Sequence, residues 1–522
     1  MIKLKIGLLP LLLVILVTSA VYGGDSLKVH SFNSFQTRDF LNPWSETGNI
    51  TGMIYNLPGN VSDFNYGLDH GKGDFHRIME ASEYQSHTLS TKSYIILNGY
   101  HLYGNFTYNK KWEMGSRWNG TYNPYRGNPY ILGDSVSGVK YRKECYELAG
   151  AIAKTLNKSI SLGCKISYLV GVGAKQKDPR PENTLVQFIV NPGIILHKEH
   201  YNLGVDLGYS NRKEEIEYKQ TVVDNSDISY FAFKGFGFYY KAIENDYFRF
   251  QNEKALFGSI QAETKKRRIT SMSEIKFKYS KEIIEDSKSA IIKERGGDWD
   301  VFDTGIKEAI SFTKNNLHHK ISFSVNYFNG DGTEFTQQKI YGGSIVEYVT
   351  IATNLKFNRT TINGQLQYDL QKFFAAEKLN WSFHSGVGSV VNNETYYYTP
   401  EVFTSAYTNV VGTTGFEKNF YLKGVHLAPM LDASYIYNIS NELNLSNQTE
   451  ITKKQNKELY ISDFNYYKAN LLKLEGQLRA GFDARKIKNI DQLFVSLNYG
   501  FFKSSNADSS LTVISGKVGF MF

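Results

Sequence analysis

The chain has 522 residues, a formal net charge of +8 and a negative mean hydropathy. After residue 23 no stretch is long and apolar enough for a membrane helix, which excludes a helical membrane protein, and the charge excess is too mild to indicate nucleic-acid binding. With 37 Tyr, 34 Phe and only 10 Pro, the composition favours long β-strands and the aromatic girdles of a membrane barrel.

Residues 1–23 are expected to be a secretory signal peptide. Lys3 and Lys5 supply a positive start, residues 6–20 an apolar stretch, and residues 21–23 a small-residue exit. Cleavage would remove the two lysines and lower the formal charge from +8 to about +6.

Residues 24–98 are expected to form an amino-terminal segment that precedes the barrel. Turn-forming residues and one large aromatic residue, Trp44, mark this segment. Two interpretations stay open: a periplasmic extension, which we prefer, and a plug folded into the lumen of the barrel. A first hairpin within 61–96 is a further alternative.

Residues 99–522 predict a transmembrane antiparallel β-barrel. In 201–209 the odd positions are Tyr, Leu or Val and the even positions are Asn, Gly or Asp, which places apolar and polar side chains on opposite faces of a strand. Similar alternation occurs in 318–327, 361–370 and 491–501, and its longest run is 458–484. Globular strands average about 5–6 residues, whereas a tilted strand that spans a bilayer needs about 9–11.

The predicted connections alternate between short and long, as in a barrel with periplasmic turns and extracellular loops. The count is about eighteen strands (16–20), provided that 219–247 is one loop and 229–236 is not a strand of the wall. The short turns are expected near 157–159, 197–200, 265–268, 314–317, 358–360, 392–394, 423–424 and 485–489. The long loops are expected at 115–142, 176–183, 219–247, 285–304, 329–338, 405–413 and 440–457.

The last strand, 510–522, has one face formed by Ile514, Gly516, Val518, Phe520 and Phe522. An amphipathic final strand that ends in Phe resembles the carboxyl-terminal signal that the barrel-assembly machinery of the bacterial outer membrane recognises. The expected partners are therefore outer-membrane lipid around the wall and that machinery at Phe522.

The two cysteines, Cys145 and Cys164, are not expected to form a disulfide. The strand phases of 143–156 and 160–174 place one of them toward the lumen and the other toward lipid.

Charged residues in the polar phase are the candidate lumen-lining residues. They would set the electric field of an open pore or, alternatively, pair across strands to stabilise the wall. They are Asp206, Asp369, Asp432, Lys473, Glu475 and Arg479. In the proline-bounded loop at 178–181, Asp178 and Arg180 would contact a ligand or, as we prefer, stiffen a turn.

No catalytic residue, metal site or cofactor is expected. His318 and His319 are adjacent on a predicted strand and point to opposite faces, so they cannot bind one metal together. His384 and Ser385 fall in different phases for the same reason.

Four short motifs carry a resemblance to a known family: Phe40-Leu41-Asn42-Pro43-Trp44, Gly133-Asp134-Ser135 with Gly138, Asp178-Pro179-Arg180-Pro181 and Asn191-Pro192-Gly193. With them the chain resembles an uncharacterised outer-membrane β-barrel family of the Bacteroidota, a domain of unknown function. The resemblance implies a barrel in the cell outer membrane and brings no substrate or catalytic residue. The chain does not resemble the larger siderophore-type receptors, which carry a plug domain and an amino-terminal coupling box.

These patterns predict an outer-membrane channel or substrate-selective transporter for small solutes rather than an enzyme, because a barrel of about 16–18 strands encloses an aqueous lumen unless something fills it. The alternative is a non-conducting scaffold whose long extracellular loops bind a surface lipoprotein or an exported protein.

Overall fold

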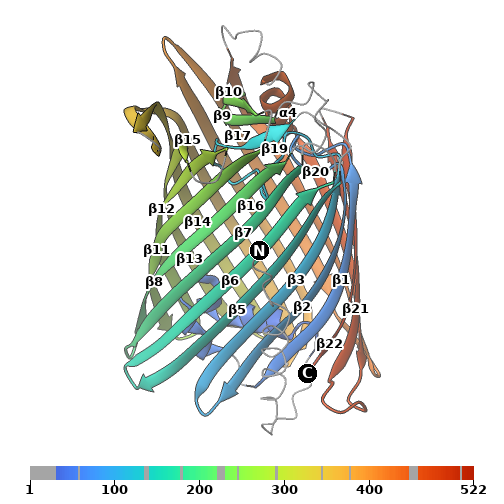
Figure 1. Cartoon of the computed structure of the whole chain (residues 1–522). Coiled ribbons are helices and arrows are strands. Elements are labelled where there is room, and N and C mark those ends of the chain that lie inside the picture. The colour runs from blue at the N-terminus through green and yellow to red at the C-terminus, as the bar shows by residue number, and fades with distance from the viewer. Residues whose placement is uncertain are drawn as a thin grey trace.

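The computed structural model describes residues 31–56, 59–134, 140–176, 180–219, 230–243, 246–288, 292–342, 345–375, 378–445, 456–505 and 508–522. Across these ranges the main sheet has nineteen β-segments, of which β17 and β18 are consecutive parts of one strand that pairs with β19, so the wall has eighteen strands. Neighbouring strands are antiparallel, and β1 pairs with β22, which closes the sheet into a barrel (Figure 1). The last residue completes this closure, because Ser62 and Phe522 exchange two backbone hydrogen bonds of 2.7 and 3.0 Å.

The first half of the wall consists of β1 (Val61–Gly73), β2 (Glu83–Leu97), β3 (Tyr100–Met114), β5 (Tyr141–Asn157), β6 (Ile160–Lys175), β7 (Arg180–His197), β8 (Tyr201–Lys219), β11 (Tyr247–Lys266) and β12 (Ile269–Ser287). The second half consists of β13 (Glu294–Lys314), β14 (Leu317–Gly342), β15 (Ile345–Ala375), β16 (Lys378–Tyr398), β17 (Glu401–Lys418), β18 (Phe420–Leu422), β19 (Val425–Asn444), β20 (Leu471–Asp483), β21 (Gln492–Ser504) and β22 (Ser510–Met521). A separate small sheet contains β4 (Leu132–Asp134), β9 (Tyr230–Gly235) and β10 (Phe238–Ile243).

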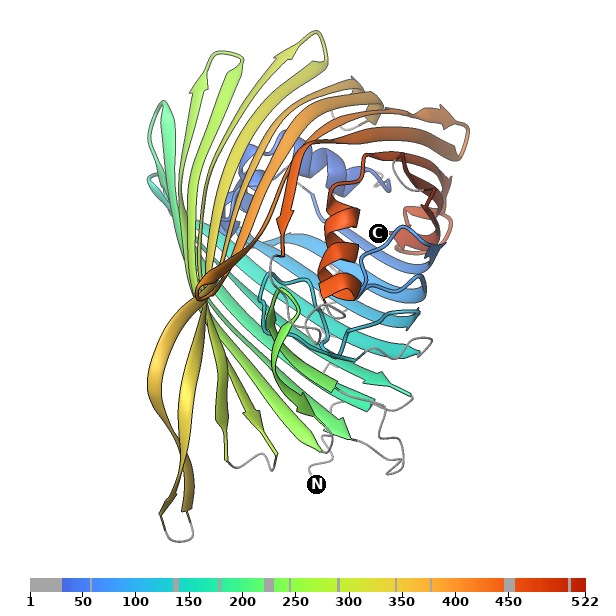
Figure 2. The ribbon, with the colours of Figure 1, turned by 90° about the horizontal axis from the view of Figure 1, so that it is seen from above.

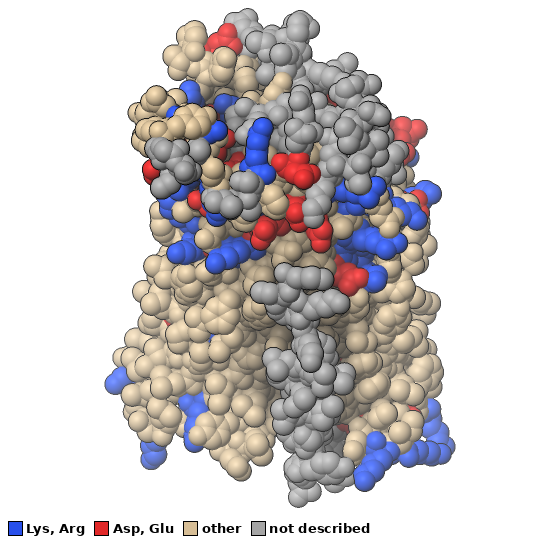
Figure 3. Space-filling view, viewed as in Figure 1, with Lys and Arg blue, Asp and Glu red and all other residues tan. Residues whose placement is uncertain are grey.

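The wall is apolar outside and polar inside. On β8, Leu207 is 55% exposed on the outer face, whereas its neighbour Asp206 is buried in the lumen. On β22, Ile514 and Val518 are likewise exposed, which confirms the predicted outward phase. Figure 3 shows a broad band almost free of charged residues, with charged residues above and below it. A closed wall with this band is an outer-membrane β-barrel.

The barrel begins at Val61 rather than at residue 99. The hairpin of β1 and β2 belongs to the wall, because β1 pairs with both β2 and β22 and thereby joins the two ends of the sheet. Sixteen of the eighteen described strands therefore follow residue 99, where the sequence predicted about eighteen.

Several predicted connections lie inside strands. The predicted loops 329–338 and 405–413 and the predicted turns 358–360 and 392–394 fall within β14 to β17. Their polar residues satisfy one another across the ladder: Asn358 is paired with Asp331, and its Nδ2 donates to Asp331 Oδ1 at 2.7 Å. The predicted strand 458–484 begins only at Leu471, because 456–467 is helical.

Residues 31–56, which we call the lumenal segment, lie inside the barrel near the short periplasmic turns (Figures 1 and 2). They form the helix α2 (Ser34–Leu41) and the 3₁₀ turns η1 (Pro43–Glu46) and η2 (Ile50–Tyr55). Met53 packs in one buried cluster with Val61, Tyr94 and Met521 of the wall. The segment therefore lies where the plug-like alternative placed it.

The extracellular end of the lumen is covered by three loops. Figure 2 shows the small sheet and the helix α4 (Ser462–Tyr467) within the outline of the wall. Here β9 pairs with both β4 and β10, which joins the β3–β5 loop to the β8–β11 loop. The stretch 229–236 thus contains a strand, but that strand belongs to this small sheet and not to the wall.

None of the helices in the described ranges is long and apolar enough to cross a bilayer. Both cysteines are free, and their register places Cys164 beside the outward-facing Ile152, whereas Cys145 lies in the opposite phase from the outward-facing Tyr146. The predicted signal peptide, 1–23, lies outside the described residues.

Candidate functional site

The lumenal segment is anchored to the wall through its 3₁₀ turns. The side chain of Asn42 accepts a hydrogen bond from the backbone N–H of Trp44 and so caps η1. The Trp44 indole is buried and donates to Glu263 Oε2 on β11 at 2.9 Å. Asn49 donates to the backbone oxygen of Ile194 at 3.1 Å.

Glycines on the lumenal face of the wall make room for this segment. A Cβ at Gly204 on β8 would lie 2.5 Å from the Trp44 ring, and one at Gly193 on β7 would collide with Asn49. Trp44 and Gly193 belong to two of the motifs singled out in the sequence, and each lies at a separate contact between the lumenal segment and the wall, Trp44 against Gly204 and Gly193 against Asn49. The close approach of the lumenal segment therefore explains why position 193 is a glycine.

Glu46 joins the lumenal segment to two lysines of the wall. Its carboxylate lies 2.7 Å from Lys307 Nζ on β13 and also pairs with Lys320 on β14. Burial alone would raise the pKa of Glu46, but the two lysines outweigh it and hold the pKa below its ordinary value. Glu46 is thus ionised at neutral pH, as an ion pair requires.

Above this contact lies a polar cavity of about 420 Å³, which we call the chamber. Its lining residues carry three lysines and three carboxylates, so the formal charges balance. They are Glu46, Glu274, Lys276, Lys307, Lys320, Ser322, Ser324, Asn326, Gln365, Gln367 and Asp369. A cavity with this lining can solvate a small polar molecule and contains no large apolar surface.

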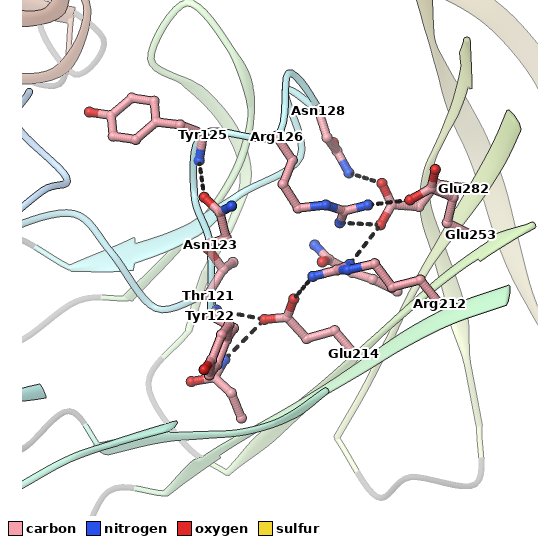
Figure 4. Close-up of polar contacts among 12 residues, drawn as sticks. Thr121, Tyr122, Asn123, Tyr125, Arg126, Asn128, Arg212, Glu214, Glu253 and Glu282 are labelled. Atoms are coloured by element: carbon pink, nitrogen blue, oxygen red, sulfur yellow. Dashed lines mark hydrogen bonds and ion pairs between the residues drawn. The ribbon is translucent and has the colours of Figure 1, made fainter. Parts of the chain in front are cut away.

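On the extracellular side, residues 115–134 form an inserted loop that is bound to the wall by charged residues (Figure 4). Arg126 contacts Glu253 on β11 at 2.6 Å and Glu282 on β12 at 2.7 Å. Tyr122 donates its backbone N–H to Glu214 on β8, which also pairs with Arg212 at 2.7 Å. The guanidinium of Arg126 thus bridges two strands, and the inserted loop is fixed against one side of the lumen.

The motif residue Asp134 anchors the other end of the inserted loop. Asp134 pairs with Lys175 at 2.9 Å, and both side chains are almost fully buried. Gly133 beside it allows a close backbone approach, because a Cβ there would collide with the carbonyl of Trp118. Ser135 and Gly138 of the same motif lie outside the described residues.

The helix α4, which we call the lid helix, rests on two loops through Asp463. Its carboxylate accepts hydrogen bonds from the Tyr125 hydroxyl at 2.9 Å and from the backbone N–H of Ile78 at 3.0 Å. Burial raises the pKa of Asp463 to about 6. Arg77 donates to the Tyr467 hydroxyl at 3.2 Å, which adds a second contact between the β1–β2 loop and the helix.

Of the six predicted lumen residues, one lines the chamber. Asp369 lies in its wall and accepts a hydrogen bond from Gln367 at 2.8 Å. Asp206 lies instead under the lumenal segment and accepts from Gln261 at 2.6 Å. The structure therefore separates these two aspartates, one beside the chamber and one in the anchor of the lumenal segment.

The other four predicted lumen residues form pairs on β16 to β20. Asp432 lies 3.1 Å from His384 Nε2, and Lys473 lies 3.2 Å from Glu475. Arg479 pairs with Glu417 at 2.7 Å. Asp432 and Arg479 thus pair across strands, which is the alternative role given to these charges, whereas Lys473 and Glu475 pair within one strand.

The structure describes one of the two predicted loop residues. Arg180 begins β7 at the extracellular end and is exposed, whereas Asp178 lies outside the described residues. His318 and His319 follow the β13–β14 turn. His318 is hydrogen-bonded to Thr313, and His319 is hydrogen-bonded to Tyr368. The described residues contain no cluster of His, Cys, Asp or Glu suited to a metal ion.

Sequence reasoning missed the residues that close the lumen, above all Glu46, Arg126 and Glu282. Glu46 follows Trp44 by two positions, so the motif around Trp44 was the only available signal for it. Arg126 lies in a loop without alternation, and its partners are more than 120 residues away along the chain.

A family model described as a family of unknown function (DUF6850) matches residues 50–522. No curated protein sequence matches the chain. Among solved structures, the copper transporter OprC is similar at 8% identity with a TM-score of 0.38, covering 89% of this chain and 80% of that chain. The outer membrane transporter YddB from Escherichia coli is similar at 9% identity with a TM-score of 0.39, covering 88% and 81%. The ferric yersiniabactin uptake receptor FyuA from Yersinia pestis is similar at 6% identity with a TM-score of 0.39, covering 90% and 81%.

Proposed function

The chain belongs to the DUF6850 family of unknown function, and we propose that this outer-membrane barrel is a gated, substrate-selective transporter of small polar solutes. The observation that carries the proposal is the chamber: a polar cavity of about 420 Å³ inside the lumen, with the lumenal segment on one side. A barrel that served only as a scaffold has no need of a polar cavity with balanced charges in its interior.

Gating, rather than free diffusion, is supported by what lies at the two ends of the lumen. The lumenal segment occupies the periplasmic end, and the inserted loop and the lid helix cover the extracellular end (Figure 2). Movement of one of these segments would widen the path for a solute. Each is held by ion pairs or hydrogen bonds to the wall or to neighbouring loops, such as Glu46 with Lys307 and Asp463 with Tyr125, which can break without unfolding the barrel.

The balanced charges of the chamber favour neutral or zwitterionic polar solutes. Lys276, Lys307 and Lys320 line the cavity together with Glu46, Glu274 and Asp369. Because a charged solute would break this balance, it would meet repulsion from one set as well as attraction from the other.

A reversible crosslink tests the proposal. An ideal Cβ at Gly48 in the lumenal segment would lie 3.2 Å from Ser259 Oγ on β11, the position that the second sulfur of a disulfide would take. The double variant Gly48→Cys, Ser259→Cys is made in a background with Cys145→Ser and Cys164→Ser, and is reconstituted into liposomes. Swelling is then measured in small polar solutes.

We expect swelling with the reduced double variant and with each single-cysteine variant, and its loss when the double variant is oxidised. Recovery on reduction is the control for folding. If the reduced protein stays impermeable, even after Glu46→Gln weakens the contact of the lumenal segment, the transport proposal is wrong. If the oxidised and reduced forms swell equally, the lumenal segment is not the gate.

One observation favours the second candidate, a scaffold whose extracellular surface binds a surface lipoprotein or an exported protein. Residues 334–342 of β14 and 345–356 of β15 pair only with each other and extend beyond the wall as a two-stranded ribbon. Tyr341 and Ile351 on this ribbon are 69% and 63% exposed. Exposed strand edges with apolar side chains are suited to a protein partner. Co-purification of a partner that is lost on deletion of the ribbon tip would support this function.

We propose that the barrel-assembly machinery recognises Phe522. Phe520 and Phe522 lie side by side with ring centroids 5.7 Å apart, at the strand that closes the barrel. The test is the yield of folded barrel in the outer membrane after Phe522→Ala.

A further inference from the structure

A second cavity lies at the extracellular end of the lumen and shares no lining residue with the chamber. It has a volume of about 130 Å³ and lies between wall strands β15 to β17, the inserted loop, the β9–β10 hairpin and the lid helix. We call it the aromatic pocket. A cavity of roughly 150 Å³ is enough to hold one benzene molecule, so the aromatic pocket has the size of a single six-membered ring.

The sides of the pocket are aromatic rings contributed by separate elements. Tyr125 comes from the inserted loop, Phe357 and Tyr407 from the wall, and Tyr460 and Tyr467 from the β19–β20 loop. Tyr407 and Tyr467 are stacked, with ring centroids 4.9 Å apart and an interplanar angle of 6°. The two rings cover one face of each other, and the aromatic surface that remains on the pocket lining can contact the flat apolar face of a ring.

The polar side of the pocket is made by Arg359, Asn392 and Glu394. The Nε of Arg359 donates to Asn392 Oδ1 at 3.1 Å and lies 3.5 Å from Glu394 Oε1. Among the residues that the structure describes, Nη1 and Nη2 of Arg359 have no hydrogen-bond partner. Arg359 lines the pocket, and these N–H groups can donate to a ligand there.

The inserted loop reaches this guanidinium through a glycine. Gly127 has a φ of +94°, a conformation that side chains disfavour, and a Cβ there would lie 3.6 Å from Arg359 Nη1. The glycine thus lets the loop turn over the guanidinium and form one side of the pocket.

The charges around the pocket are balanced, which favours a neutral ligand. Its lining carries two guanidiniums, Arg77 and Arg359, and two carboxyl groups, Glu394 and Asp463. Arg359 lies beside Glu394, and the Arg77 guanidinium lies 3.7 Å from the centroid of the Tyr125 ring. A charged ligand would lose its hydration without gaining an unpaired counter-charge.

We propose that the aromatic pocket binds a neutral, polyhydroxylated six-membered ring, such as a hexopyranose unit, with its C–H face against the tyrosines and its hydroxyl edge on Arg359, Asn392 and Glu394. Such a ring is apolar on its faces and polar at its edge, which matches the two kinds of surface in the pocket. The identification of this ring as the transported solute rests on the function proposed above. Binding itself does not depend on transport.

Binding is measured by titration calorimetry on the full barrel in detergent. The neutral ligands are D-glucose, D-galactose and myo-inositol, and D-glucuronate and D-glucosamine are their charged counterparts. Arg359→Gln removes donors, and Tyr407→Leu replaces an aromatic face by an aliphatic side chain. The matched controls are Arg485→Gln in a periplasmic turn and Tyr499→Leu on the outer face of the wall, where Tyr499 is exposed.

We expect at least one neutral ring to bind, with each charged counterpart weaker. Arg359→Gln should weaken binding about tenfold or more, since one lost charge-assisted hydrogen bond corresponds to that factor. Tyr407→Leu should also weaken binding, because it removes an aromatic face. The control variants should bind as the unaltered protein does, and Arg359→Lys should restore part of the loss. The proposal is overturned if no neutral ring binds, if the charged sugars bind more tightly, or if folded Arg359→Gln and Tyr407→Leu proteins both bind normally. Binding without transport would retain this site and reject the transporter.

Discussion

The indole nitrogen of Trp44 lies 2.9 Å from the carboxylate of Glu263, and both side chains are buried although they are 219 residues apart in the chain. This hydrogen bond joins the lumenal segment to β11. Because a buried carboxylate must have its acceptors satisfied, the bond fixes the segment in one position rather than leaving it loose in the lumen.

We expect Trp44→Phe to loosen the lumenal segment while the wall stays folded. The change removes one of two donors to Glu263 Oε2, which keeps its hydrogen bond from Asn202 at 2.6 Å. Loss of a hydrogen bond to a charged group costs about 1.5–3 kcal/mol. Hydrogen exchange of residues 42–56 should become faster, and exchange of the wall strands should not change. Trp381→Phe, whose ring stacks near Phe416 on the outer face, is the control. Equal protection of residues 42–56 in both variants would contradict the assigned role of Trp44.

Glu46→Gln should release the segment from β13 and β14. The substitution leaves Lys307 and Lys320 without the carboxylate that they share, and loss of one partner from a partly buried pair costs up to about 3 kcal/mol. A cysteine placed at Gly48 should then react faster with a maleimide than the same cysteine in a protein with Glu46. Glu144→Gln, which removes the outer-face pair with Lys110, should leave that rate unchanged.

Arg126→Gln should free the inserted loop. Glu253 and Glu282 would lose a shared cation that is largely buried. We therefore expect the bound position of the loop to lose stability of the order of 3 kcal/mol relative to the released position. The measurement is hydrogen exchange of residues 119–130. In the same loop, Arg117 pairs with Glu458 in a more exposed position, and Arg117→Gln should cost only about 0–1 kcal/mol. If the two variants exchange alike, Arg126 does not hold the loop.

The lid helix should open more readily at pH 8 than at pH 5. Burial raises the pKa of Asp463 from its ordinary value of 3.8 to about 6. A carboxyl group with a raised pKa stabilises the closed state fully below its ordinary pKa, and this stabilisation is lost as the pH rises through about 6; it amounts to up to about 3 kcal/mol. The distance between spin labels at Asn465 and Thr399, both exposed, reports the opening. Asp463→Asn should remove the pH dependence, and a persistent dependence would assign it to another group.

The sequence predicted which face of the wall a strand side chain occupies, because that face depends only on the position of the residue along the strand. Alternation placed Val518 and Leu207 outside and Asp206 inside without knowledge of any partner strand. It failed between 329 and 413, where Asn, Gly and Asp indicate turns locally but are satisfied by neighbouring strands, as Asn358 is by Asp331. The motif around Trp44 was visible, but its place inside the lumen was not.

Local periodicity thus determined an outer-membrane barrel with an apolar exterior, since lipid constrains every second residue of each strand independently. Only the tertiary structure decided how the lumen is filled, because the contacts that fill it join residues far apart in the chain: Glu46 meets Lys320 across 274 positions. A single ion pair of this kind leaves no repeat in the sequence. The candidate chamber and the aromatic pocket are therefore products of the closed barrel and of the segments folded into it.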